Sequence, residues 1–462
     1  MAETEGGAST LSFDKVLIAN RGEIALRVIR ACRELGIQTV LVYSEADAHS
    51  LPVHLADEAI CIGPPSARES YLNIPAIISA ALISGAQAVH PGYGFLSENA
   101  DFSEVCREHG LVFIGPPPEV LGKFHDKAAT RALMRQYGLP VIPGSDGAVR
   151  TVSEALRIAE AIGYPVMLKA RSGGGGRGMR KAGSAKDLQR LWDQARSEAK
   201  ASFGDDGVYI ERNLEGVRHV EAQVLADEHG AAVCMGEREC SIQRRNQKMI
   251  EEAPSASIGL ELQHRIARMS VDAALRSGYR NVGTFEFLVD GDGEPYFIEV
   301  NARIQVEHTV TEMVTGIDLV KEQIALAAGE ALSFSEEQVW VNGHAIECRI
   351  NAEDPDAGFA PSTGVLTTFL TPSGPGIRVD SHCFQGYEVP PYYDSLLAKV
   401  IAWGRDRPEA VARMQRALDE TTIVGVTTNI TAHKRILGSD LFRDGKVTTH
   451  LIDTVGIEAL AG

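Results

Sequence analysis

The sequence is poor in the features that mark secreted, membrane-bound or disulfide-bonded proteins. Its longest largely apolar run, 76–83, is far shorter than the ~20 residues that a membrane-spanning helix needs. The N-terminus, Met-Ala-Glu-Thr-Glu, has neither the positive charge nor the apolar stretch of a secretory signal. The 7 cysteines are scattered without a C-x-x-C pair, as is typical of reduced core residues. We therefore expect a cytoplasmic protein without a membrane segment.

Familiar nucleotide-binding motifs and excess positive charge are also lacking. The first β-turn-α segment reads Ala19-Asn20-Arg21-Gly22-Glu23 rather than G-x-G-x-x-G, which excludes a nicotinamide-dependent enzyme. The P-loop pattern G-x-x-x-x-G-K-[ST] does not occur, which excludes P-loop NTPases. The formal net charge of −17 argues against nucleic acid or an anionic membrane as a partner. Small molecules or other proteins remain as the expected partners.

What is present is an ordinary globular composition of 44% hydrophobic and 23% charged residues, with 462 residues for two or three domains. Over the first 114 residues, short β-rich runs alternate with segments of helical periodicity. This pattern predicts a parallel sheet with helices on both faces. The expected strands are 15–20, 39–43, 59–62, 88–90 and 111–114, and helices are expected over 75–84 and 100–109.

A small α+β unit is predicted next. Thr151-x-x-Glu154 is a capping box that opens a helix to residue 162. A strand over 166–170 follows, then a helix over 185–202 and a strand over 208–211. The 166–170 strand carries Lys169 and leads into a glycine run, 173–176, whose backbone N–H groups would suit a phosphate. A glycine run by itself is more often a flexible tip or linker.

From residue 217 the pattern changes to antiparallel strands, expected over 219–226, 231–235 and 283–289. The polar, basic segment 243–248 is predicted to be a loop that binds an anion, the alternative being a solvated face. Later segments predict a helix over 318–328, strands over 344–350 and 396–402, and a helix over 407–420.

The most informative stretch is 298–308, which we predict to be one strand. Alternation would place Glu299, Asn301, Arg303 and Gln305 on one face. With a hairpin loop at 290–293, Val289 would lie opposite Glu294, and Glu286 would be a diagonal neighbour of Glu299 within ~8 Å. Oxygen ligands of this kind suit Mg²⁺ or Mn²⁺. The alternative is a buried ion-pair network.

Several segments together resemble the ATP-grasp superfamily: Lys169 with its glycine run, the set Glu286, Glu299 and Asn301, and the stretch from Arg303 to His308. The chain from residue 11 to 452 is more closely similar to the biotin carboxylase family. The motifs that carry this resemblance occur in order: Ala19-Asn-Arg-Gly-Glu-Ile24, His90-Pro-Gly-Tyr-Gly-Phe-Leu-Ser-Glu-Asn99, Gly283-Thr-Phe-Glu-Phe287, Arg349-Ile-Asn-Ala-Glu-Asp354 and Pro390-Pro-Tyr-Tyr-Asp-Ser395.

The resemblance implies an α/β and α+β protein with an ATP-grasp fold. Its expected parts are a disordered tail (1–10), a Rossmann-like parallel-sheet domain (11–114), a linker (115–141), a mobile ATP-grasp flap (142–212) and a C-terminal antiparallel-sheet domain (213–462). The implied reaction is the phosphorylation of bicarbonate by ATP, after which carboxyphosphate delivers CO₂ to N1 of biotin. Mg²⁺ or Mn²⁺ would be required, and biotin would be a carried substrate.

Residue roles also follow from the resemblance. ATP would contact Lys127, Lys169, Gly175, Gly176, Glu211, Arg212, Asn213, Leu214, His219, Asn246, Glu286, Leu288 and Glu299. The metal would be held by Glu286, Glu299 and Asn301. Bicarbonate would be bound by Lys248, Arg303, Gln305 and Val306, and biotin by Tyr93, Phe95 and Arg349. The catalytic set would be Lys248, Arg303, Glu307 as base, and Arg349 at the biotin enolate. Because Glu307 would face away from Arg303 on a regular strand, its role requires a bend near Gln305.

Four positions depart from the usual family pattern. Asn246 replaces a histidine, Arg171-Ser172 replaces Ser-Gly, Asn213 replaces an aromatic residue and His125 replaces a glycine. All four would lie at the nucleotide pocket or flap, so ATP affinity or flap closure is expected to differ.

The sequence contains no Met-Lys-Met biotinylation motif. Biotin would therefore come from a biotin carboxyl carrier protein or domain, with a carboxyltransferase subunit as the second partner. The resemblance also implies a homodimer, with Arg30 and Arg378 as interface candidates. Two other functions are alternatives to this biotin carboxylase hypothesis: an ATP-grasp ligase that joins a carboxylate to an amine, and a non-catalytic subunit that organises an assembly.

Overall fold

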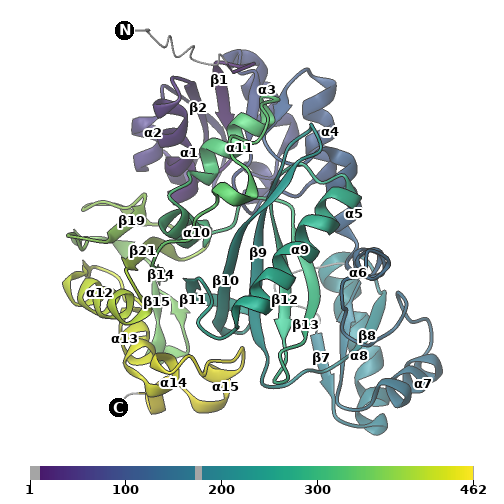
Figure 1. The fold of residues 1–462 in the computed structure, drawn as a ribbon. Coiled ribbons are helices and arrows are strands. Elements are labelled where there is room, and N and C mark those ends of the chain that lie inside the picture. The colour runs from purple at the N-terminus through teal and green to yellow at the C-terminus, as the bar shows by residue number, and fades with distance from the viewer. Residues whose placement is uncertain (1–10, 172–178, 461–462) are drawn as a thin grey trace.

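The computed structural model describes residues 11–171 and 179–460, and Figure 1 shows their arrangement. The predicted tail, 1–10, and the predicted ATP contacts Gly175 and Gly176 lie outside these residues. The N-terminal part forms a parallel sheet with strand order β3-β2-β1-β4-β5. Its strands are β1 (Lys15–Ile18), β2 (Gln38–Ser44), β3 (Glu58–Gly63), β4 (Ala88–His90) and β5 (Val112–Phe113).

Helices cover both faces of this sheet because its strands are apolar on both sides. On one face, Leu17 and Val89 pack with residues of α3 (Ile74–Ser84) and α4 (Ala100–Glu108). On the other, Val16 and Ile18 pack with α1 (Gly22–Glu34) and with α11 (Leu319–Ala327) from much later in the chain. The predicted parallel sheet with helices on both faces is confirmed. Short helices α2 (Leu51–Leu55), α5 (Pro118–His125) and α6 (Lys127–Gln136) complete this half.

A second, smaller sheet projects from the molecule at the lower right of Figure 1. It is antiparallel with strand order β7-β6-β8, from β6 (Val166–Ala170), β7 (Met179–Ala182) and β8 (Val208–Arg212). Helices α7 (Val152–Ile162) and α8 (Ala185–Phe203) supply its core. The predicted capping box is present in part. The Thr151 side chain accepts from the Glu154 N–H, but the Glu154 side chain accepts from the N–H of Arg150 rather than from that of Thr151. We call β6–β8 with these two helices the lid.

The centre of the molecule is an antiparallel sheet with strand order β13-β12-β9-β10-β11-β14-β21-β19. Its strands are β9 (Arg218–Ala226), β10 (Ala232–Arg244), β11 (Gln247–Ala253), β12 (Asn281–Val289), β13 (Pro295–Asn301), β14 (His344–Asn351), β19 (Ile377–Ser381) and β21 (Leu396–Gly404). The predicted loop over 243–248 is wrong. Strands β10 and β11 pair almost to their ends, and the reversal is a tight turn at Arg245 and Asn246, both with positive φ.

The prediction of one strand over 298–308 is also wrong. Strand β13 ends at Asn301, residues 302–307 leave the sheet, and α10 (His308–Thr315) begins directly after Glu307. The predicted pairing of Val289 with Glu294 is off by one residue, because Val289 pairs with Pro295. A register shift between Glu286 and Phe287 then makes Glu286 the direct cross-strand partner of Glu299, not a diagonal neighbour.

Helices α9 (Leu260–Ser277), α12 (Arg407–Glu420), α13 (Ile430–Gly438), α14 (Asp440–Arg443) and α15 (Leu451–Val455) flank the central sheet. Three small two-stranded sheets join β15 (Glu353–Asp354) to β16 (Ala360–Pro361), β17 (Gly364–Val365) to β20 (Glu388–Val389), and β18 (Thr368–Leu370) to β22 (Thr422–Val424). Within the described residues, every helix is too short or too polar to pass through a bilayer. The domain boundaries given above stay a prediction.

Candidate active site

A cavity of about 900 Å³ lies between the lid, the central sheet and the loop that follows β4. The predicted site residues that line it are Tyr93, Lys127, Lys169, Arg212, Asn213, Leu214, His219, Asn246, Lys248, Glu286, Leu288, Glu299, Asn301, Arg303, Gln305, Val306, Glu307 and Arg349. Residues more than 250 positions apart in the sequence therefore share one cavity.

Two predicted contacts stand back from the cavity lining. Glu211 on β8 is buried behind Lys169, whose Nζ donates to its Oε2 at 2.6 Å. Phe95 stacks on Tyr71 with ring centroids 5.0 Å apart, in the core of the N-terminal sheet. Glu211 thus supports Lys169, which lines the cavity, whereas Phe95 packs in the core, and neither has the direct position expected.

Lys248 on β11 is the central cation of the site. Its Nζ donates to Glu221 at 2.5 Å, to Glu307 at 2.6 Å and to Glu286 at 3.0 Å. Burial disfavours the charged ammonium, but the Cys240 thiol and these three carboxylates together raise the pKa of Lys248 well above its ordinary value. The lysine therefore stays charged, and it draws carboxylates from β9, β12 and the 302–307 loop together.

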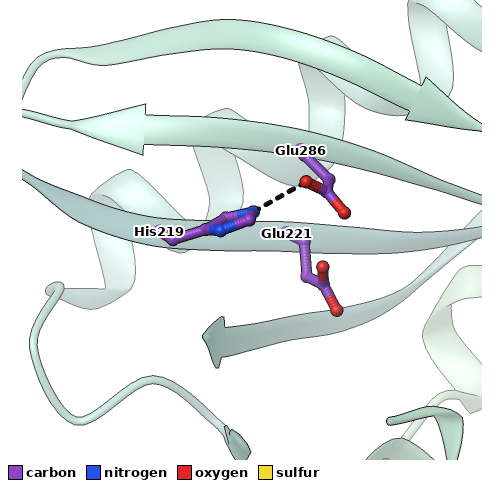
Figure 2. Close-up of side chains that lie close together, drawn as sticks. All are labelled: His219, Glu221 and Glu286. Carbon is purple, nitrogen blue, oxygen red and sulfur yellow. Dashed lines mark ion pairs between the residues drawn. The ribbon is translucent and has the colours of Figure 1, made fainter. Parts of the chain in front are cut away.

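Glu286 on β12 is the most connected carboxylate. Figure 2 shows it beside His219 and Glu221, two residues of the neighbouring strand β9, with His219 Nε2 2.8 Å from Glu286. Burial would lower the pKa of His219, but Glu286 raises it above its ordinary value. Side-chain amides of Asn301 and Gln305 also donate to Glu286, at 2.7 and 2.8 Å. The ligand atoms of His219, Glu221 and Glu286 lie within 4.8 Å of one another, and the ammonium of Lys248 contacts both carboxylates.

The predicted metal ligands lie on the adjacent strands β12 and β13. Direct pairing places Glu286 and Glu299 side by side on one face of the sheet. Glu299 accepts from Lys127 Nζ at 2.5 Å and is 31% exposed toward the cavity, so its oxygens are accessible. Asn301 adds a third oxygen-bearing side chain that reaches Glu286. Hard oxygen ligands beside a space for phosphates fit a Mg²⁺ or Mn²⁺ ion.

Glu307 reaches the site because the chain leaves the strand after Asn301, a few residues before Gln305, near which its predicted role required a bend. It occupies the N-cap position of α10, accepts from Lys248, and accepts from Arg349 at 2.9 Å. Burial acts to raise the pKa of Glu307, but the Lys248 and Arg349 cations lower it below the ordinary range. Glu307 is thus an ionised carboxylate held between two cations.

The loop after β4 closes the site from the N-terminal side. Glu98 accepts from the Ala302 N–H and from Arg303 Nε, both at 3.0 Å, which anchors the start of the 302–307 loop. Arg303 also donates to Asn301 Oδ1 at 2.9 Å. The bend that removes 302–307 from the sheet is therefore stabilised by a residue some two hundred positions earlier.

Sequence reasoning missed several residues of this network. Arg238 on β10 is fully buried and donates to Glu221 at 2.6 Å, as well as to Gln223, Thr284, Thr311 and Gln305. Glu251 on β11 accepts from Arg349 Nε at 2.6 Å. The sequence did contain a signal for the polar face of β9. There His219, Glu221 and Gln223 alternate with apolar residues, the same pattern that drew attention to β13.

The departures from the family pattern lie close to the cavity. Asn246 and His125 line it. Arg171 donates to Asp205 at 2.9 Å, and the Asn213 N–H donates to the Pro165 carbonyl at 2.9 Å. Asn246 lies in the β10–β11 turn with a φ of +61°, a left-handed conformation that asparagine tolerates better than most residues.

A small antiparallel lid facing a larger antiparallel sheet, with lysines on one side and paired glutamates on the other, defines an ATP-grasp enzyme. Family models match almost the whole chain: "Biotin carboxylase, N-terminal domain" over 12–121, "Carbamoyl-phosphate synthase L chain, ATP binding domain" over 126–335, and "Biotin carboxylase C-terminal domain" over 347–454. The chain belongs to the biotin carboxylase family, and the expected fold is confirmed.

Individual relatives agree with the family models. The biotin carboxylase of Nostoc sp. is 53% identical over 442 residues, covering 96% of this chain and 99% of that protein. The Campylobacter jejuni biotin carboxylase bound to a β-γ-ATP ligand superposes with a TM-score of 0.94 at 47% identity, covering 96% and 99% of the two chains. The biotin carboxylase domain dimer of Hydrogenobacter thermophilus 2-oxoglutarate carboxylase, bound to MgADP, ADP and bicarbonate, has a TM-score of 0.93 at 49% identity, covering 96% and 98%.

Proposed function

We propose that this chain catalyses the ATP-dependent carboxylation of biotin by bicarbonate, the first half-reaction of a biotin-dependent carboxylase. The observation that carries the proposal is the cluster of Lys248, Arg303 and Arg349 around Glu307 in one cavity. An ionised carboxylate bonded to two cations, with a third cation, Arg303, lining the same cavity, suits an anionic substrate that must lose a proton and then attack a phosphoryl group. Phosphoryl transfer is promoted mainly by positioning and charge neutralisation, which such a cluster provides.

ATP would lie at the lid side of the cavity. Lys127 and Lys169 would bind its phosphates, exchanging their present partners Glu299 and Glu211 for phosphate oxygens. The hinge residues Arg212, Asn213 and Leu214, with Leu288 and Asn246, would enclose the nucleoside. By the family resemblance, Gly175 and Gly176 would bind the phosphates. Glu286, Glu299 and Asn301 would hold Mg²⁺, which would neutralise charge on the transferring phosphoryl group.

Bicarbonate would lie between Lys248, Arg303, Gln305 and the main chain of Val306. Glu307 would accept its proton, so that a bicarbonate oxygen attacks the γ-phosphorus and ADP leaves. The resulting carboxyphosphate breaks down to CO₂ and phosphate, and the phosphate takes the N1 proton of biotin. Arg349 would stabilise the negative charge that develops on the biotin ureido oxygen as N1 attacks CO₂.

Biotin would enter beside Tyr93 and Arg349, which both line the cavity. Phe95 would contribute indirectly, by anchoring the loop that carries Tyr93 to the core of the N-terminal sheet. We propose a biotin carboxyl carrier protein or domain and a carboxyltransferase as partners, and a homodimer as the assembly, as in the dimer of the Hydrogenobacter domain. Arg30 is exposed on α1, and Arg378 is bonded to Glu312 and Asp380, so Arg30 is the more available interface residue. All 7 cysteines are free, which supports a cytoplasmic location.

The test is ADP release from Mg-ATP with and without bicarbonate and free biotin. We expect release that requires bicarbonate and rises with biotin, and Arg349→Ala should remove the rise while leaving ATP binding intact. Release that ignores biotin but requires an amine would favour the carboxylate-amine ligase instead. Failure to bind ATP would favour a non-catalytic assembly subunit.

A further inference from the structure

Lys399 on β21 is a fully buried lysine to which the proposed reaction gives no role. Its side chain has no exposed surface, although burying an ammonium costs considerable solvation free energy. Burial acts to lower the pKa of Lys399, but the carboxylates of Glu23, Glu347 and Asp380 raise it overall, so the lysine stays charged. Buried ion pairs seldom add stability compared with apolar residues, so a role in positioning other groups has to be considered.

The two partners of Lys399 come from parts of the chain that are far apart in the sequence. Its Nζ donates to the Val306 carbonyl at 2.8 Å, in the loop that carries Gln305 and Glu307. The same Nζ lies 3.3 Å from Glu23 Oε2, in the first turn of α1. Lys399 therefore connects the 302–307 loop to the N-terminal part of the chain.

Glu23 continues the connection to the proposed biotin side. Its other oxygen, Oε1, accepts a short hydrogen bond from the Tyr93 hydroxyl. A continuous path thus runs from Tyr93 through Glu23 and Lys399 to the Val306 carbonyl.

The strand pairing shows why Lys399 can hold this position. Across the sheet it is the direct partner of Arg349 on β14 and of Asp380 on β19. Direct partners point to the same face, so Lys399 lies beside the arginine that bonds Glu307. A lysine at this register reaches the main chain of the 302–307 loop, while Arg349 reaches the Glu307 side chain.

Building on the proposed function, we propose that Lys399 and Glu23 are positioning residues that orient the 302–307 loop for bicarbonate and tie it to the Tyr93 loop. Because Lys399 binds the Val306 carbonyl, it fixes the peptide that joins Val306 to Glu307, and with it the direction of the Glu307 carboxylate. The two loops that meet the two substrates are then coupled through one buried ion pair. Neither residue touches a substrate.

The experiment compares Lys399→Met, Glu23→Gln and the double variant with the wild-type chain. We expect Lys399→Met to lower kcat/KM for bicarbonate about a hundred-fold, the effect of a small misplacement of reacting groups, with the KM for ATP changed less than about two-fold. Glu23→Gln should act in the same direction. The double variant should lose no more than Lys399→Met alone, because the two residues act as one unit. Lys399→Arg should recover part of the activity.

Amide hydrogen exchange gives a readout that does not depend on the reaction. Lys399→Met should speed exchange in 302–308, and Glu23→Gln should speed it in both 90–99 and 302–308. The control is Lys434→Met, which removes a lysine paired with Asp419 at the surface and should change neither kinetics nor exchange. If Lys399→Met matches this control in bicarbonate KM and in the exchange of 302–308, the proposal is wrong. A wild-type chain without bicarbonate-dependent ADP release would overturn the proposed function, while the exchange data would still decide the role of Lys399.

Discussion

At the scale of single residues, the site is a set of charged side chains, and the cost of burying each charge depends on the others. Lys248 and Arg238 share Glu221, which has no exposed surface, and Lys248 also binds Glu286 and Glu307. In such a cluster each charge offsets the cost of burying its neighbours, so removing one cation leaves carboxylates unpaired. Two substitutions separate the catalytic from the structural part of this cluster.

Replacing Lys248 with Met should abolish most of the chemistry and spare the nucleotide site. We expect bicarbonate-dependent ADP release to fall by about 10²–10³-fold, as when one preorganised electrostatic group is lost. ATP affinity, measured by titration with a fluorescent nucleotide, should stay within a few-fold of wild type because Lys127 and Lys169 are untouched. Lys434→Met serves as the control. Equal losses in ATP affinity and turnover would assign Lys248 to the nucleotide instead.

Replacing Arg238 with Met should mainly destabilise the chain. The buried Glu221 carboxylate would lose one of its two cationic partners, at a cost of about 3–5 kcal/mol in the free energy of unfolding. Urea unfolding followed by circular dichroism measures this. The double variant Arg238→Met with Glu221→Gln should regain part of the loss, since no charge is left unpaired. A double variant as unstable as the sum of the single ones would argue against the pair as the cause.

At the scale of elements, strand pairing decides which titratable groups meet. The pairing of β11 with β14 places Glu251 directly opposite Glu347, and both are fully buried. Burial and the nearby Glu251 carboxylate, opposed by the positive charge of Lys399, together raise the pKa of Glu347 to about 8. Burial also raises the pKa of Glu251. Two glutamates on adjacent strands therefore keep a proton that exposed glutamates would have lost.

The proton shared by Glu251 and Glu347 should make the stability of the chain fall as the pH rises toward 8. Between about pH 4.5 and 8 the folded chain holds a proton on this pair that the unfolded chain releases, so the free energy of unfolding decreases with pH. Glu347→Gln should flatten this slope when urea unfolding is repeated across the range. The exposed Glu261→Gln is the matched control and should keep the wild-type slope. A Glu347→Gln slope equal to wild type would show that the pair does not hold the proton.

At the scale of the whole molecule, the cavity is built from three parts of the chain that meet only after folding. Lys169 comes from the lid, Glu286 and Glu299 from the central sheet, and Tyr93 from the N-terminal part. A ligand that bridges the lid and the central sheet binds only the folded chain, and it must stabilise that state by mass action.

MgATP should therefore raise the stability of the chain in a metal-dependent way. At a free concentration of a hundred times its Kd, it should add about 2.7 kcal/mol to the free energy of unfolding. Chelating the metal with EDTA should remove much of this gain, and Glu299→Gln should weaken the metal-dependent part. The control Glu261→Gln should keep the full gain. The proposed metal role of Glu299 would be contradicted by a Glu299→Gln chain that responds to Mg²⁺ as wild type does.

The sequence was sufficient for much of the local structure. The strands Ala88–His90 and Val166–Ala170 and the helix Arg407–Glu420 have the bounds that their periodicity predicts. Asn73 caps its helix by accepting from the Ala76 N–H, as expected of an asparagine just before a helical run. These features depend on neighbours within a few residues, which periodicity and capping preferences describe. The ordered family motifs then indicated which side chains would share a site.

Only the tertiary structure decided how those side chains meet. The alternation that predicts a strand through 308 continues in the sequence past Asn301, but Glu98 binds Ala302 and Arg303 and holds the chain out of the sheet. The full length of β10 was hidden because Arg238 is polar, and it is buried with partners from β9, β12, α10 and the 302–307 loop. Burial of a charge depends on the charges that surround it in space, and these come from residues far apart in the chain. Periodicity records which face a residue occupies, whereas its partners are set by how the sheets and loops pack.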